Sequence, residues 1–122
     1  MSLSEGQRAA LRIAHMLEAI TGVSQIIGSA NSGAVAADWV KARALERGFE
    51  IISEASRHIP DNLKATEPHI PWRQVAGLGN VLRHDYDGVE IALLLVSAKS
   101  DLPELQAALH RILDRLNSSG SV

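Results

Sequence analysis

The chain has 122 residues, of which 46% are hydrophobic, so it is long enough to bury the core of one domain. Its 12 basic and 14 acidic residues give a formal net charge of -2, which offers no general attraction to nucleic acid or to an anionic membrane. It contains no cysteine, which excludes disulfides, thiolate metal sites and cysteine nucleophiles.

Two stretches bear on where the protein is located. The first residues, Met1 to Glu5, lack a basic region followed by an apolar run, so we expect no signal peptide. The most apolar stretch, Ile91 to Val96, is far shorter than the roughly 20 residues that a bilayer requires. Together with the absence of cysteine, these features predict a cytoplasmic protein that does not enter a membrane.

The N-terminal part of the chain predicts a long helix. Ser4 and Gln7 have the spacing of a capping box, and apolar residues follow them at helical intervals. We therefore expect the first helix to run from about Glu5 to Ile27. A cluster of glycine, serine and asparagine at residues 28–33 ends it, because these residues favour turns and left-handed caps.

A second helix is expected to begin at Ala34 and to end before Pro60. Charged residues occupy most of its surface, and one face is apolar or small. The residues predicted to form that buried face are Ala42, Leu45, Phe49, Ile52 and Ser56. Residues 60–65 then predict a single helical turn, since proline is tolerated at the first helical position.

Two further segments are expected to be helical in the second half of the chain. A third helix is predicted to begin at Pro71 and to run to about His84. Residues 89–96 form an apolar run without clear periodicity. Because no second strand is available to pair with this run, a buried helix is favoured over a strand.

The last helix is predicted from an acidic capping pair, Asp101 and Glu104, around Pro103. Leucine and isoleucine then recur at intervals of three and four residues. The helix is expected to end near Asn117, with residues 118–122 forming a frayed tail.

These elements together predict the fold class. Long helices, short connections and the absence of strand-like alternation indicate an all-α protein. We expect an antiparallel up-and-down helical bundle of four to five helices in a single domain over residues 1–122.

The third predicted helix carries the polar residues of most interest. Its expected core face consists of Trp72, Val75, Leu78 and Leu82. The opposite face consists of Arg73, Gly77, Asn80 and His84. Gly77 and Gly79 each cost helix stability by about 1 kcal/mol relative to alanine, which suggests that another backbone or a ligand approaches closely there.

His84 can accept and donate a proton near neutral pH, and an arginine can hold a phosphate through two parallel hydrogen bonds. Such groups are sufficient to cleave RNA without a metal. Structural alternatives exist for each residue. A histidine at a helix end can cap the helix, Arg83 can be a solvated cation, and Tyr86 can pack at the rim of the core.

A metal site is not predicted. The other histidines are scattered over separate segments, and Asp85 and Asp87 beside His84 would form only an incomplete set of ligands. No glycine-rich phosphate loop or hydrolase triad motif is present, so no cofactor is predicted either.

The segment from Ile70 to Val89 resembles the signature of the HepT-like family within the HEPN superfamily. The likeness rests on Ile70-Pro71-Trp72-Arg73 leading through Leu78-Gly79-Asn80-Val81-Leu82-Arg83-His84-Asp85-Tyr86 to Gly88-Val89. Residues 46–55 are similar to the second-helix segment of that family, and residues 101–103 to the start of its last helix. The resemblance therefore extends over nearly the whole chain.

The resemblance implies a specific function. Members of the family are helical bundles that usually dimerise, and active members are metal-independent endoribonuclease toxins. Their antitoxin is a small MNT nucleotidyltransferase that can transfer AMP to a tyrosine near the motif histidine. By resemblance, His84 is the motif histidine, Tyr86 is the candidate AMP acceptor, and the two copies of the motif meet across the interface of a homodimer.

One position departs from the family pattern. Active members carry an arginine separated from the histidine by four to six residues, most often four; with four intervening residues this position is Gly79 here, and with six it is Gly77. The first hypothesis is a toxin that cleaves RNA, with His84 as acid/base, Arg73 or Arg83 on the phosphate, and Asn80 beside them. The second is a HEPN module without catalysis, which binds a nucleotidyltransferase partner or a nucleotide. The third is a bundle with an unrelated structural role.

Overall fold

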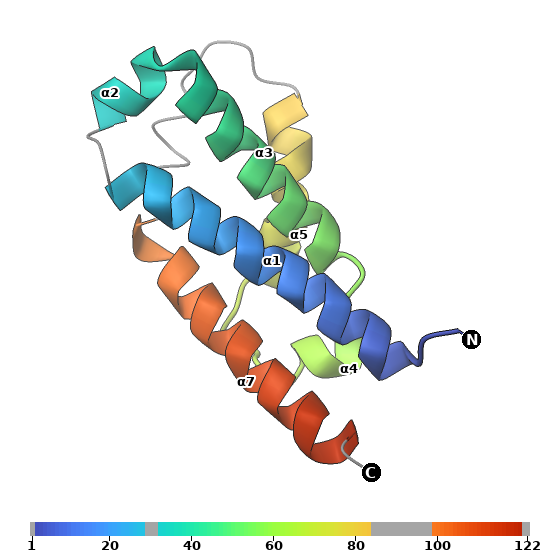
Figure 1. The fold of residues 1–122 in the computed structure, drawn as a ribbon. Helices are drawn as coiled ribbons and strands as arrows, with labels where there is room; N and C mark the ends of the chain where they lie inside the picture. The colour runs from blue at the N-terminus through green and yellow to red at the C-terminus, as the bar shows by residue number, and fades with distance from the viewer. Residues whose placement is uncertain (1, 29–31, 84–98, 121–122) are drawn as a thin grey trace.

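The computed structural model describes residues 2–28, 32–83 and 99–120, and every regular element within these ranges is a helix (Figure 1). The helices are α1 (Glu5–Gly28), α2 (Ser32–Ala37), α3 (Trp39–Ser56), α4 (Asp61–Lys64), α5 (Trp72–Arg83) and α7 (Leu102–Gly120). The predicted all-α class is confirmed. The helix predicted around residues 89–96 lies outside the described residues.

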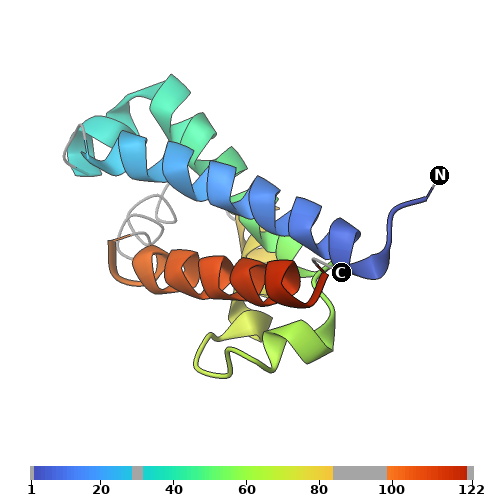
Figure 2. The ribbon, with the colours of Figure 1, turned by 60° about the horizontal axis from the view of Figure 1, so that its bottom comes forward.

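The helices pack in antiparallel pairs. α1 lies between α3 and α7 and runs in the opposite direction to both, and α5 packs antiparallel against α3 (Figure 1). Figure 2 shows α7 between α1 and the segment that contains α4. None of the helices in the described part of the chain is both long enough and apolar enough to cross a membrane.

The start of α1 has the predicted capping box. The backbone N–H of Gln7 donates to Ser4 Oγ at 3.1 Å, and the backbone N–H of Ser4 donates to Gln7 Oε1 at 2.8 Å. These bonds satisfy two donors that a helix end otherwise leaves without a partner. The helix begins at Glu5 and ends at Gly28, so its predicted extent is confirmed to within one residue.

The predicted second helix is in fact two helices, and Asp38 is the reason. α2 ends at Ala37, and Asp38 has an extended backbone conformation with its Oδ1 accepting the N–H of Lys41 at 3.1 Å. Aspartate is a preferred N-cap because its carboxylate satisfies an amide of the first turn. The run from Ser32 to Ala37 therefore forms a separate short helix, which includes two residues, 32 and 33, that were expected to lie in the turn.

The predicted core face of α3 is confirmed. All five of its members are buried, and Phe49 and Ile52 are at most 1% exposed. They pack with apolar residues of α1, α2, α5 and α7 in one continuous cluster. The largest fully buried apolar side chains are Phe49, Ile13, Met16, Ile20, Leu45, Ile52, Leu109, Ile112, Val23 and Val35.

α1 and α3 approach each other closely at Gly48. A Cβ atom at this position would lie only 2.5 Å from Cγ2 of Val23 on α1. Val23 is fully buried and its branched side chain has little rotamer freedom in a helix, so it cannot easily move away. The absence of a side chain at Gly48 therefore allows the two helices to pack at this distance.

The end of α7 differs from the prediction. The helix continues through Gly120 instead of ending near Asn117, so residues 118–120 are helical and only 121–122 lie outside the described residues. Serine is only moderately worse than alanine in a helix interior, and two serines alone do not end one. The sequence lacks a proline or an early glycine that would stop the helix at Asn117.

The buried carboxylate of Glu67 binds the connection between α4 and α5 to α7 through ion pairs. Glu67 is 2% exposed and binds two arginines of α7. Its Oε1 lies 2.5 Å from Arg111 Nη2 and its Oε2 lies 2.6 Å from Arg115 Nη2. Hydrogen bonds from Arg111, together with those from Arg115 and the charges of both, outweigh the desolvation of Glu67 and lower the pKa of its carboxyl group from 4.5 to about 2.

The same connection also fixes the start of α5. Trp72 Nε1 donates to the carbonyl oxygens of Lys64 and Glu67, both at 3.1 Å. The first residue of α5 is therefore attached to the segment that Glu67 holds on α7. This chain of contacts sets where the helix with the candidate site begins.

We predict that Gly48→Ala lowers the free energy of unfolding by about 1–3 kcal/mol, because the added methyl overpacks the α1–α3 contact. Urea unfolding followed by circular dichroism measures the change. Gly22→Ala is the matched control, since nothing lies within 4 Å of a Cβ at Gly22. It should be neutral or stabilising by up to about 1 kcal/mol through helix propensity. Equal effects of the two changes would contradict this packing argument.

We predict a dependence of stability on pH that requires Glu67. Because folding lowers its pKa from 4.5 to about 2, its contribution is fully present above about pH 4.5 and is lost as the pH falls toward 2. Glu67→Gln should lower the free energy of unfolding at pH 7 by about 3 kcal/mol and should flatten the loss between pH 4.5 and 2. Urea unfolding at several pH values measures both effects, with Glu54→Gln on the surface as control.

Candidate functional site

The face of α5 that packs on α3 agrees with the predicted core face where the structure describes it. Val75 is buried, and Trp72 and Leu78 are half-buried against the core. The side chain of Leu82 lies outside the described residues. Trp72 does more than the prediction assigned to it, since its indole N–H also anchors the start of the helix.

Ser53 of α3 joins the two helices at the middle of α5. Ser53 is fully buried, and its hydroxyl donates to the carbonyl oxygen of Ala76 at 2.8 Å. Ser53 Oγ in turn accepts the backbone N–H of Gly79 at 3.0 Å. A Cβ atom on Gly79 would lie 3.2 Å from Ser53 Oγ, which is tighter than ordinary van der Waals contact. A group does approach Gly79 closely, but it is the side-chain hydroxyl of Ser53 and not the backbone or ligand that the glycines predicted.

Gly77 has a different environment from Gly79. Nothing lies within 4 Å of the position that a Cβ on Gly77 would occupy, so packing among the described residues does not require a glycine there. Since Gly77 also lowers helix propensity, its presence has no structural explanation in this part of the chain.

A guanidinium group lies beside Gly79. Nη2 of Arg57, the residue that follows α3, is 3.6 Å from the position that a Cβ on Gly79 would occupy. The side chain of Arg57 is exposed. The sequence analysis did not single out this residue, because only the pairing of α3 with α5 brings it to the glycine.

The structure describes only some of the predicted site residues. Arg73 lies in the first turn of α5 with its side chain exposed. Asn80 and Arg83 are residues of the same helix, of which the structure describes only the backbone. The side chains of Asn80 and Arg83 lie outside the described residues, as do His84 and Tyr86 altogether. Their assignment to a site therefore stays a prediction from the sequence.

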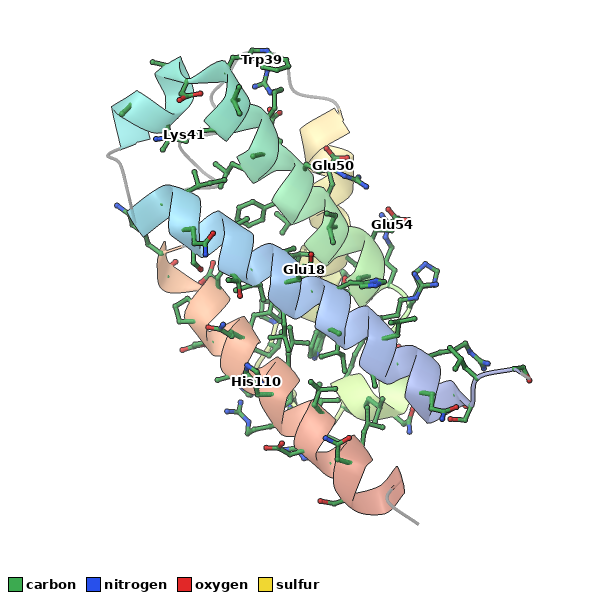
Figure 3. The ribbon with its side chains drawn as sticks, in the orientation of Figure 1. Glu18, Trp39, Lys41, Glu50, Glu54 and His110 are labelled. Carbon is green, nitrogen blue, oxygen red and sulfur yellow. The ribbon has the colours of Figure 1, made fainter. Side chains whose placement is uncertain are left out.

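The remaining histidines lie on separate parts of the bundle. His110 is exposed on α7 (Figure 3), His58 is exposed after α3, and His69 lies 3.8 Å from Glu67 Oε1. Within the described ranges, no group of three or more histidine, aspartate or glutamate side chains is placed to hold a metal ion.

A groove between α1 and α3 contains charged groups of both signs. It encloses about 420 Å³ and is lined by Arg12, His15, Glu18, Ala19, Arg47, Ile51, Glu54 and Ala55. Figure 3 shows Glu18 on α1 and Glu54 on α3. Its two arginines and two glutamates balance in charge, so the groove has no net preference for an anion or a cation.

Comparison with known proteins identifies relatives over more than half of the chain. It is 39% identical over 69 residues to a protein of Thermococcus cleftensis named "Probable ribonuclease HepT", which covers 57% of this chain and 63% of that protein. It is 40% identical over 63 residues to a protein of Methanocaldococcus jannaschii named a "Putative RNase", which covers 52% of this chain and 58% of that one. The chain thus matches about six tenths of the length of these two relatives.

A third relative extends the same pattern to another organism. A "Putative RNase" of Caldanaerobacter subterraneus subsp. tengcongensis is 32% identical over 78 residues, which covers 64% of this chain and 70% of that protein. No solved structure matches the chain. The family model described as "Ribonuclease HepT-like" matches residues 16–112, from the middle of α1 to the middle of α7. The fold and this match agree with the likeness in the sequence, and the chain belongs to the ribonuclease HepT-like family.

Proposed function

We propose that this protein is the toxin of a HEPN/MNT toxin-antitoxin pair and that it acts as a homodimeric, metal-independent endoribonuclease. The observation that carries the proposal is the family match over residues 16–112, which includes the segment from Ile70 to Gly88. The ribonuclease names of three relatives from three organisms support the same activity. The proposed substrate is RNA, and the proposed location is the cytoplasm.

The chemistry that we propose requires one proton acceptor and one proton donor. The 2′-hydroxyl of a ribose attacks the adjacent phosphorus and loses its proton, while the bond from phosphorus to the 5′-oxygen breaks and that oxygen is protonated. The products are a 2′,3′-cyclic phosphate and a 5′-hydroxyl. His84 can perform either proton transfer near neutral pH, and two copies in a homodimer supply one base and one acid.

The phosphate requires a cation during this reaction, because negative charge builds up on its oxygens. Arg73 and Arg83 are the candidates on α5 itself, and Asn80 supplies an amide one turn before His84. By helix rise, Arg73 is about 16 Å from His84 along an uninterrupted helix, so it would serve the motif of the partner subunit and not its own.

We further propose that an MNT-type nucleotidyltransferase is the antitoxin and that Tyr86 is its target. The phenolic oxygen of Tyr86 would attack the α-phosphorus of ATP and release pyrophosphate, leaving AMP on the tyrosine. This adds a negatively charged group two residues from His84. A phosphodiester would be repelled by that charge, which explains how the modification would silence the toxin.

We predict that His84→Ala lowers the rate of RNA cleavage at least about a hundredfold, since general acid/base groups contribute that much or more. The assay uses a labelled RNA with a chelator of divalent cations present and identifies cyclic phosphate ends. His110→Ala is the matched control, because His110 is exposed on α7 and has no role in the proposal. Equal cleavage by wild type and His84→Ala would refute the catalytic claim.

A second candidate function is a HEPN module that binds the nucleotidyltransferase or a nucleotide without cleaving RNA. Gly79 favours this alternative, since the motif arginine is missing there and Ser53 Oγ leaves little room for a side chain. In this case the wild-type protein would dimerise and co-purify with the product of a neighbouring nucleotidyltransferase gene, but it would not cleave RNA. Ser53→Ala combined with Gly79→Arg would then create cleavage activity, because it restores the arginine and removes the obstructing hydroxyl.

A further inference from the structure

Trp39, the first residue of α3, exposes a large aromatic ring to solvent. It is 70% exposed, which is the highest value among the large apolar side chains that the structure describes, and the neighbouring Val40 is 68% exposed. A tryptophan in a folded domain normally buries most of its surface. The packing of the described residues therefore does not use most of the ring of Trp39.

The ring is nevertheless held in place on one side. The guanidinium of Arg43, one turn further along α3, lies 5.7 Å from the centroid of the ring, within the range of a cation–π contact. Arg43 in turn forms an ion pair with Glu46. The guanidinium covers only part of the ring, since the residue stays 70% exposed. Trp39 is thus oriented by its neighbours and keeps free aromatic surface.

Trp39 stands on the face of α3 that turns toward α5. It lies eighteen residues before Arg57, which is five full helical turns, so the two residues share one face. Nη2 of Arg57 is 3.6 Å from the position of a Cβ on Gly79 of α5, so this face meets α5 further along. The start of α3 and the end of α5 lie at the same end of the bundle (Figure 1), and Figure 3 shows Trp39 there.

The hydrogen bond between Ser53 and Gly79 sets how far the two helices extend toward that end. From this bond, α5 continues by about 6 Å to Arg83, whereas α3 continues in the same direction by about 21 Å to Trp39. Trp39 therefore lies about 15 Å beyond the last residue of α5, measured along the helices. A single strand of RNA a few nucleotides long can span this distance.

The charges around Trp39 balance. Arg43 pairs with Glu46 and Arg47 pairs with Glu50, so neither arginine has an unopposed charge. The first turns of α3 and its N-cap carry three acids and three bases, namely Asp38, Lys41, Arg43, Glu46, Arg47 and Glu50. Such a surface has no net attraction for phosphates, but a free aromatic ring can stack on a planar, uncharged group.

We propose that Trp39 stacks on a base of the RNA substrate, a few nucleotides from the phosphate that is cleaved beyond the end of α5. This inference rests on the proposed ribonuclease function and names a residue that positions the strand without taking part in the proton transfers. Every base has an aromatic face, so the contact adds affinity with little preference for sequence.

The test measures the binding of a short, fully 2′-O-methylated RNA, which cannot be cleaved by attack of the 2′-oxygen. Fluorescence anisotropy of the labelled RNA gives the affinity of wild type, Trp39→Ala and Trp39→Phe at several salt concentrations. Val40→Ala is the matched control, because it removes the adjacent, equally exposed apolar side chain. Tryptophan fluorescence reports the stacking itself, since the other tryptophan, Trp72, is half-buried with its N–H bonded.

Trp39→Ala should weaken binding by about tenfold or more, as expected for the loss of one base stack. The slope of log affinity against log salt should not change, because no phosphate contact is lost. Trp39→Phe should retain part of the affinity, and Val40→Ala should retain all of it. RNA should quench the tryptophan fluorescence of wild type but not that of Trp39→Phe.

A second RNA lacks the base at one nucleotide and is made for each position in turn. At one position the loss of the base should weaken binding by wild type about as much as Trp39→Ala does. The same RNA and the intact RNA should bind Trp39→Ala equally, because the base and the ring act only on each other.

Several results would overturn this role of Trp39. One is equal binding of RNA by wild type and Trp39→Ala, and another is a wild type that binds no RNA. A third is a Trp39→Ala variant that sediments as a weaker dimer while its RNA affinity is unchanged, since the ring would then contact a second copy of the chain. Failure of the ribonuclease proposal is seen separately, as equal cleavage by wild type and His84→Ala. Circular dichroism melting checks that Trp39→Ala is folded.

Discussion

Glu67 binds two parts of the protein at once. Its carboxylate accepts hydrogen bonds from Arg111 and forms an ion pair with Arg115, both on α7. Its backbone carbonyl oxygen accepts the indole N–H of Trp72 at the start of α5. α5 therefore begins where Glu67 holds the connection against α7. A buried carboxylate is costly to desolvate, and two guanidiniums offset that cost here. The position of α5 depends on this balance.

The second constraint on α5 comes from α3. Ser53 binds α5 through a hydroxyl that contacts one carbonyl oxygen and one amide, and it does so only because residue 79 has no side chain. A similar relation holds between α1 and α3, where Gly48 makes room for Val23. α3 thus contacts both neighbouring helices at a glycine. Its own Gly48 contacts α1, and Gly79 of α5 contacts Ser53 of α3.

Much of the fold could be predicted from the sequence because the patterns are local. The capping box at Ser4 and the helical spacing of apolar residues determine α1 and the core face of α3, and the structure confirms both. The break between α2 and α3 at Asp38 is not predicted from the sequence, because the apolar spacing remains compatible with one continuous helix and a single capping residue is a weak signal. α7 extends beyond the predicted end near Asn117, because the sequence contains no stop signal for a helix before Gly120.

The candidate site was less predictable, because its parts come from different helices. The sequence places two glycines and several polar residues on α5, and it shows that the family arginine is missing at Gly79. It cannot show that Ser53 and Arg57 meet that glycine, since both are more than 20 residues away in the chain. Such contacts follow from the pairing of α3 with α5, which no local pattern encodes.

The guanidinium beside Gly79 belongs to Arg57, the residue that follows α3, so its position relative to α5 depends on two helices. An arginine on α5 would move with α5, whereas the distance from Arg57 to Gly79 depends on the alignment of two separate helices. A slide of one helical turn is about 5.4 Å and would carry the guanidinium away from Gly79 without breaking either helix, but it would break both hydrogen bonds of Ser53. The distance from Arg57 to Gly79 is therefore maintained by two buried bonds of one hydroxyl group.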